Sequence, residues 1–202
     1  MKTQIIDETQ IDIVVNSLKN NQTIAYKTDT IFGLSCLATS TKACKNLVKI
    51  KQRSDKPLII FVGKKMDINK YVKNIPNKLN NIINKFWPGP LTIIFELNYP
   101  FCKHITCNKN TIAIRNPDHD FTQNVLLKLN EPIVTTSANK SGQQNLNNVQ
   151  DIFNSFNNQI SYIIKPNLDN DDTPSTIITC LDNKIEILRE GAIKKEQLQP
   201  FM

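Results

Sequence analysis

Four short apolar runs in this chain lead directly into polar or basic side chains. The residues are Thr28 and Thr30 after 24–26, Arg115 after 112–114, Thr135, Ser137 and Asn139 after 133–134, and Arg189 after 185–188. In α/β sheets, ligands bind beyond strand ends, where groups from several connections converge. If these ends meet, they form a pocket with two arginines, several hydroxyls and an asparagine, which suits carboxylate and phosphate groups.

A second basic group lies in the segment "KIKQRSDKP", residues 49–57. Lys51 and Arg53 fall at the C-terminal end of an expected helix, and Lys56 lies just beyond it. Cations at that end are favourable against the helix dipole, which is a sufficient structural explanation by itself. Because an apolar strand follows at once, a second interpretation stays open, in which these residues face a ligand from a helix-to-strand connection.

Familiar nucleotide-binding and hydrolase motifs are missing from the sequence. The chain has 5 glycines and contains neither GxGxxG nor GxxxxGK[ST]. It has 2 histidines and no GxSxG, so a Ser-His-Asp hydrolase is not indicated. His119 is better explained as part of a helix start than as a catalytic group. A nucleotide would therefore be held by side chains and strand-end amides.

The segment "CKHITC" brings Cys102, His104 and Cys107 close together in the sequence. A structural metal site needs four ligands at more regular spacing, so we expect a plain loop and no protein-held metal. The 5 cysteines are odd in number and include no CxxC, which argues against a disulfide framework.

Composition limits the class of protein further. With 202 residues and 40% hydrophobic residues, the chain can bury a sizeable core. The formal net charge of +7 suggests anionic partners such as nucleotides, pyrophosphate or RNA, although a Lys- and Asn-rich composition explains it equally well. No apolar run reaches the roughly 18 residues that span a bilayer, and the N-terminus has no secretory pattern. We therefore expect a cytoplasmic protein with no membrane partner.

Helices and strands must position the polar residues named above. Apolar periodicity predicts helices over 11–18, from Ser40 or Thr41 to about 50, over 79–86, after Asp118 to 129, and after Asn148 to 156, with Ser40 or Thr41, Asp118 and Asn148 as caps. Strands are predicted around Ile24 and over 57–62, 91–97, 111–115, 161–165, 175–180 and 184–190, with another beginning at 132. Helices and strands alternate early and strands dominate late, which favours an α/β or α+β fold with a mixed sheet. No boundary divides the chain, so residues 1–202 are expected to form a single domain.

Seven ordered segments make the sequence resemble the YrdC-like family, which contains the threonylcarbamoyl-AMP synthases. They are "KTDTIFGL", "KIKQRSDKPLIIFV", "WPGPLTIIF", "TIAIRNPDH", "PIVTTSANKSG", "PSTII" and "ILREGAI", and the likeness runs from about residue 11 to 193. The resemblance implies a twisted α/β sheet flanked by helices, with a deep, basic, concave cavity. It also implies a nucleotidyltransferase that converts L-threonine, bicarbonate and ATP into threonylcarbamoyl-AMP and pyrophosphate.

The resemblance also implies roles for individual residues. ATP is expected at Lys51, Arg53, Lys56, Thr111, Ser137, Asn139, Asn145 and Arg189, with Lys51 and Arg53 as catalytic cations. Threonine is expected at Thr28, Thr30, Arg115, Thr135 and Ser175, with Arg115 on its carboxylate. Mg²⁺ is expected with ATP, held mainly by phosphates rather than by the protein.

The implied partners lie in tRNA modification. The product would serve N6-threonylcarbamoylation of adenosine 37 in tRNAs that read ANN codons. The chain ends without the additional C-terminal domain of longer members, so this short form is expected to rely on transfer proteins of the TsaB, TsaD and TsaE type. Direct contact with tRNA is left open.

Two departures from the family pattern are visible. Lys27 stands where the family usually has proline. The lysine would add a charge near the cavity mouth. The connection after Arg53 looks one residue shorter, which makes Lys56 a weaker match. Two alternatives to the synthase remain: a non-catalytic module of the same fold that binds tRNA or double-stranded RNA, and a paralogue with another substrate.

Overall fold

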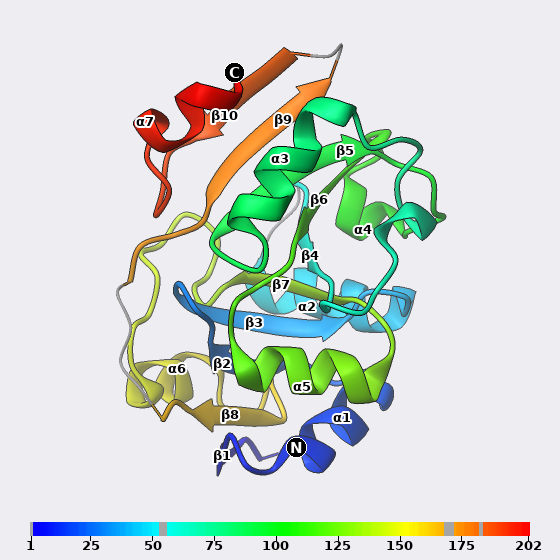
Figure 1. Ribbon diagram of the computed structural model, residues 1–202. Helices are drawn as coiled ribbons and strands as arrows, with labels where there is room; N and C mark the ends of the chain where they lie inside the picture. The colour runs from blue at the N-terminus through cyan, green and yellow to red at the C-terminus, as the bar shows by residue number, and fades with distance from the viewer. Residues whose placement is uncertain (1, 53–55, 168–171, 182–183) are drawn as a thin grey trace.

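In the computed structural model, residues 2–52, 56–167, 172–181 and 184–202 are described. Ten strands form one mixed sheet in the order β1-β8-β2-β3-β7-β4-β6-β5-β9-β10. The strands are β1 Gln4–Asp7, β2 Ile24–Lys27, β3 Phe32–Leu37, β4 Ile59–Phe61, β5 Leu91–Glu96, β6 Thr111–Arg115, β7 Ile133–Ser137, β8 Tyr162–Lys165, β9 Thr176–Leu181 and β10 Lys184–Arg189. The sheet twists so strongly that β3 and β9 run in clearly different directions (Figure 1).

Helices cover both faces of this sheet. They are α1 Ile11–Lys19, α2 Thr41–Lys51, α3 Asn77–Phe86, α4 Lys103–Thr106, α5 Asp120–Leu129, α6 Val149–Phe156 and α7 Lys195–Leu198, with 3-10 turns η1 Ile68–Lys70 and η2 Gln199–Phe201. Figure 1 shows α5 in front of β3 and α2 behind it. A twisted α/β sheet flanked by helices is the expected fold class, and it is confirmed.

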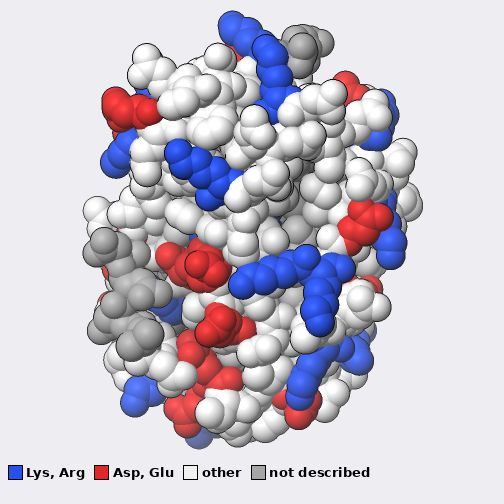
Figure 2. Space-filling view, in the orientation of Figure 1, with Lys and Arg blue, Asp and Glu red and all other residues white. Residues whose placement is uncertain are grey.

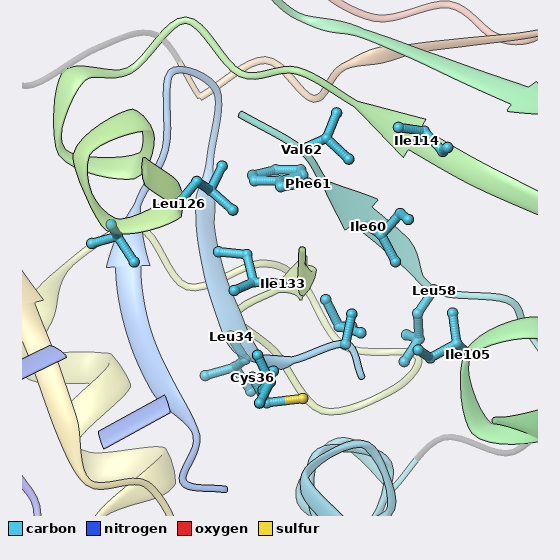
Figure 3. Close-up of a cluster of buried hydrophobic side chains, with 14 of the residues drawn as sticks. Leu34, Cys36, Leu58, Ile60, Phe61, Val62, Ile105, Ile114, Leu126 and Ile133 are labelled. Atoms are coloured by element: carbon cyan, nitrogen blue, oxygen red, sulfur yellow. The ribbon is translucent and has the colours of Figure 1, made fainter. Parts of the chain in front are cut away.

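The centre of the sheet is also the centre of the core. Strand β7 pairs antiparallel with β3 on one side and with β4 on the other, and β4 pairs parallel with β6. Figure 3 shows Leu34, Ile60 and Ile133 from these strands gathered with Leu126 of α5. All four side chains are buried, so the apolar parts of β3, β4 and β7 hold the two halves of the sheet together.

Local signals explain where α2 and α6 begin. The Ser40 hydroxyl accepts a hydrogen bond from Ala43 N at 3.1 Å, and Asn148 Oδ1 accepts one from Asp151 N at 2.9 Å, so both are N-caps as expected. The expected cap at Asp118 is wrong. The helix begins one residue later with His119 at the N-cap, because the Asp118 amide donates to Asp29 Oδ2 and its own carboxylate is exposed.

Strand β3 was not anticipated by the sequence. The strands predicted from the sequence do not include residues 32–37, which form a six-residue strand between β2 and β7. Every residue in β3 is buried, so it lacks the alternation of apolar and polar residues that marks a half-exposed strand. The short edge strand β1 was also missed.

Candidate functional site

The polar strand ends singled out in the sequence, apart from Asn139, converge on one cavity of about 330 Å³. Its polar lining consists of Thr28, Thr30, Lys109, Arg115, Thr135, Thr136, Ser137, Ser175 and Arg189. Apolar side chains such as Phe61, Ile94 and Ile177 complete the wall. No aspartate or glutamate occurs among the lining residues that the structure describes, so the cavity favours anionic groups.

Arg115 is the most enclosed cation of this cavity. Its side chain is 3% exposed, and its Nη2 lies 2.6 Å from Asp29 Oδ1 in an ion pair. The other nitrogens donate to two neutral acceptors, Nε to the Gly89 carbonyl oxygen at 3.0 Å and Nη1 to Thr30 Oγ1 at 2.8 Å. Burial lowers the pKa of Arg115 from its usual value, and Asp29 opposes that shift. The guanidinium is therefore fixed and charged at the cavity wall.

The turn after β2 presents Thr30 to Arg115. Thr28 Oγ1 accepts hydrogen bonds from the amides of Thr30 at 3.1 Å and Ile31 at 3.2 Å, which closes the turn. Gly33 then begins the close approach to β7, because a Cβ atom there would lie 2.8 Å from Thr135 Cγ2. The Thr135 hydroxyl is hydrogen-bonded to Ser35 Oγ at 2.8 Å. The hydroxyls of Thr28 and Thr135 are therefore both held by hydrogen bonds within the protein.

Arg189 and Ser175 form another part of the wall. Arg189 donates through Nε at 3.1 Å and Nη2 at 2.7 Å to the Ser175 carbonyl oxygen. The Ser175 hydroxyl is bonded to the buried Thr92 Oγ1 at 2.9 Å. Burial lowers the pKa of Arg189, and the nearby charge of Arg115 lowers it further. The two guanidinium groups repel each other, so an anion bound in the cavity would be stabilised by both.

Lys51 lies behind the cavity wall rather than in it. Its side chain is 2% exposed, and Nζ donates to the Ser137 carbonyl oxygen and to Asn139 Oδ1, both at 2.6 Å. Ser137 Oγ also donates to Asn139 Oδ1 at 2.6 Å. The basic segment 49–57 and the polar end of β7 therefore meet. Lys51 fixes the end of β7 from which Ser137 faces the cavity.

Other predicted site residues do not line this cavity. Thr111 at the start of β6, Asn145 in the connection before α6, Asn139 and Lys56 lie outside its described lining. Asn145 instead donates to the Leu146 carbonyl oxygen at 3.3 Å. Arg53 lies outside the described residues, so its expected role remains a prediction.

Two residues of the site were missed by sequence reasoning. Lys109, two positions before β6, lines the cavity, and Asp29 pairs with Arg115 from behind. The position of Asp29 between two threonines was a usable signal, because a carboxylate at a strand exit needs a partner when it is buried. Lys109 offered no such signal, since it lies among polar loop residues.

Lys27, the departure from the family pattern, is a buried cation. Its side chain is 4% exposed, and Nζ lies 2.6 Å from Asp172 Oδ1. Nζ also lies 5.7 Å from the centre of the Phe32 ring. The lysine does not line the cavity, and its charge is balanced by the segment that leads to Ser175.

The structure also bears on metals and membranes. Among the described residues, no group of three His, Cys, Asp or Glu side chains is arranged to hold a metal ion, and Cys102 and Cys107 flank the short helix α4. Within the same residues, no helix combines the length and apolar character required to cross a bilayer.

Comparisons with known proteins agree with this architecture. The family model Sua5_yciO_yrdC, described as telomere recombination, matches residues 16–191. A threonylcarbamoyl-AMP synthase of Bacillus subtilis is 30% identical over 96% of this chain, which spans 56% of that protein. One from Vibrio vulnificus is 32% identical, over 88% of this chain and 96% of its own length.

A solved structure resembles the whole chain. The crystal structure of P. abyssi Sua5 complexed with L-threonine superposes with a TM-score of 0.93 at 27% identity. The match covers 99% of this chain and 61% of that one. The chain thus spans little more than half the length of some relatives and nearly the full length of others.

Proposed function

Because this chain belongs to the Sua5/YciO/YrdC family, we propose that it is an L-threonylcarbamoyladenylate synthase. The observation that carries the proposal is the convergence of Arg115, Thr30 and Ser175 with Ser137 and Arg189 on one cavity. The first group suits an amino acid, and the second suits a nucleotide phosphate. A relative of known structure binds L-threonine, which supports that choice of amino acid.

The proposed reaction begins with the amine of L-threonine. The neutral amine nitrogen attacks the carbon of CO₂, and the carbamate forms with release of one proton. If the attack is on bicarbonate instead, the carbamate forms with release of one water and no net proton. A carbamate oxygen then attacks the α-phosphorus of ATP, the bond from that phosphorus to the β-phosphate oxygen breaks, and pyrophosphate leaves. Because the reacting groups are mostly anionic, positioning and cationic stabilisation would supply most of the rate.

On the amino-acid side, Arg115 would hold the threonine carboxylate, with Thr30 and Ser175 beside it. Thr28 and Thr135 would complete that wall, since both line the cavity with their hydroxyls already engaged in the protein. These contacts would orient the amine towards the middle of the cavity. The resulting restriction of the substrate is the expected contribution of this side to the rate.

On the nucleotide side, Arg189 and Ser137 would contact MgATP directly. Lys51 and Asn139 would act through Ser137, which they hold by hydrogen bonds. Four further residues remain proposed ATP contacts, and each would depend on the bound nucleotide extending beyond the cavity lining: Arg53, Lys56, Thr111 and Asn145. Without carboxylates in the described cavity lining, Mg²⁺ is expected to arrive on the phosphates as part of the substrate.

The proposal is tested by incubating purified protein with MgATP, labelled bicarbonate and single amino acids. Pyrophosphate release that requires L-threonine supports the synthase. Equal release with L-serine, or none with any amino acid, contradicts it. A downstream role in adenosine 37 modification, with separate transfer proteins, follows from the same proposal and is tested by adding those proteins and tRNA.

A non-catalytic RNA-binding module is the less supported alternative. On the face shown in Figure 2, Lys and Arg are interspersed with Asp and Glu rather than forming one continuous basic surface. Buried Arg115 and Ser175 at strand ends are not needed by a protein that binds only phosphate backbone.

A further inference from the structure

Asp29 lies directly behind the amino-acid side of the cavity. Its Oδ1 is 2.6 Å from Arg115 Nη2, and its Oδ2 accepts a hydrogen bond from Asp118 N at 3.0 Å. The carboxylate is 11% exposed and does not line the cavity, so it touches a ligand only through Arg115. No role for it follows from the proposed reaction alone.

The contacts of Arg115 leave it free to bind a ligand in one orientation. Gly89 O, Thr30 Oγ1 and Asp29 each engage a different nitrogen of the guanidinium. Because Nη1 carries two N–H groups and gives one of them to Thr30, a donor remains on Nη1 for a group in the cavity, whereas Nη2 is buried against Asp29. Asp29 is the only charged member of this set, so it determines most of the orientation.

Asp29 also changes the charge that a ligand meets. The Asp29–Arg115 pair is close to neutral as a unit, whereas Lys109 and Arg189 have no ion-pair partner among the residues in the described ranges. A zwitterion carries a carboxylate but little net charge, so the neutrality of this pair weakens its binding only a little. A polyanion gains much more at the uncompensated cations.

We infer that Asp29 is a positioning residue that makes the Arg115 end of the cavity selective for an amino-acid zwitterion over pyrophosphate and phosphate. The inference rests on the proposed function, in which pyrophosphate is a product formed in the same cavity. Asp29 then prevents that product from occupying the place of the next amino acid.

The test is calorimetric binding of L-threonine and of inorganic pyrophosphate to the full chain, in separate titrations and in competition. In Asp29→Asn, threonine binding weakens by about fivefold or more, and pyrophosphate binds about tenfold more tightly and displaces threonine. The matched control is Asp118→Asn, which removes the same charge from an exposed side chain and keeps the amide that donates to Asp29. The control remains within about twofold of the unchanged protein for both ligands.

Asp29→Glu separates charge from position and serves if the asparagine variant does not fold. It keeps the carboxylate but displaces it by one methylene, so threonine binding weakens while pyrophosphate does not compete. The inference is overturned if Asp29→Asn and Asp118→Asn behave alike, or if Asp29→Glu admits pyrophosphate. If the unchanged protein binds no L-threonine at all, the proposed function fails and the inference fails with it. If it binds L-threonine but the variants give the contradicting results just named, only the inference fails.

Discussion

The ammonium group of Lys51 donates a 2.6 Å hydrogen bond to the side-chain oxygen of Asn139. These residues lie in two segments that the sequence treats as separate, the end of α2 and the end of β7. Their contact turns a helix terminus and a strand terminus into one rigid unit behind Ser137. Lys51 therefore supports the nucleotide side of the proposed site from within the protein.

Replacement of Lys51 by methionine tests this supporting role. Loss of the ammonium removes the charged donor of the Ser137 carbonyl and leaves Asn139 Oδ1 with the Ser137 hydroxyl as its donor, so the free energy of unfolding falls by about 2 kcal/mol. The apparent affinity for ATP falls as well. Urea unfolding and nucleotide titration measure the two effects. Lys49→Met, an exposed change on the same helix, is the control, and equal effects in both variants would count against the role.

Arg115 and Arg189 are predicted to serve different substrates. Arg115→Ala weakens L-threonine binding by more than about tenfold, with a smaller effect on ATP, because the carboxylate loses its fixed guanidinium partner. Arg189→Ala shows the reverse preference. Calorimetric titration of each variant with each ligand gives the four dissociation constants. If both variants weaken both ligands by similar factors, the division of the cavity is wrong.

The Lys27–Asp172 ion pair is predicted to respond asymmetrically to mutation. Asp172→Asn lowers the free energy of unfolding by about 2 kcal/mol, because a charge is removed opposite a buried ammonium, an effect reduced by the partial exposure of Asp172. Lys27→Met costs less, since a similar volume without charge fills the site. Combining both changes costs no more than Lys27→Met alone. A denaturant-based double-mutant cycle measures this, and strict additivity would exclude the coupling.

Gly33 is predicted to be intolerant of a side chain. A Cβ atom would lie 2.8 Å from Thr135 Cγ2 and 3.3 Å from the Thr136 carbonyl oxygen, so Gly33→Ala lowers stability by about 2 kcal/mol. It also weakens L-threonine binding, because Thr135 is displaced at the cavity wall. Gly142→Ala is the contrasting variant, because an added Cβ would meet no atom within 4 Å but the residue has φ +84. This substitution therefore lowers stability without changing L-threonine binding. Unchanged binding in Gly33→Ala would separate Gly33 from the site.

His119 is predicted to make stability depend on pH. Burial lowers its pKa below the usual 6.5, although Glu8, Asp29 and Asp120 oppose that shift. The unfolded chain therefore binds the proton more readily, and stability falls as pH drops below 6.5, by at most about 1.4 kcal/mol per pH unit. His119→Gln flattens this dependence relative to the unchanged protein. Thermal unfolding from pH 5 to 8 is the measurement, and equal slopes in the variant and the unchanged protein would refute the assignment.

The convergence of the site could be predicted from the sequence. Thr30, Arg115, Ser137 and Arg189 each follow an apolar strand, and strand ends in an α/β sheet meet at shared edges. These signals are local, so they survive without knowledge of the fold. The order of the seven family segments added the expected substrates and residue roles, but not the hydrogen bonds within the protein.

Contacts between residues that are distant in the chain explain what the sequence did not reveal. The family resemblance implies an ATP role for Lys51, but it does not reveal the hydrogen bond that reaches across 86 residues to Ser137. Asp118 was placed as a cap because its type and position fit, whereas its amide is held by Asp29, 89 residues away. Strand β3 was missed because complete burial removes its periodicity. In each case the deciding partner is distant in the chain.

The cavity wall begins at Thr28 and ends at Arg189, so it draws on strands from both halves of the sheet. No part of the chain can build this wall before the remainder has folded. A ligand that binds there therefore has affinity for the native state alone, and its binding free energy adds to the stability of the entire sheet. Substrate concentration and resistance to global unfolding are thermodynamically linked in this protein, and the linkage extends to strands that never touch the substrate.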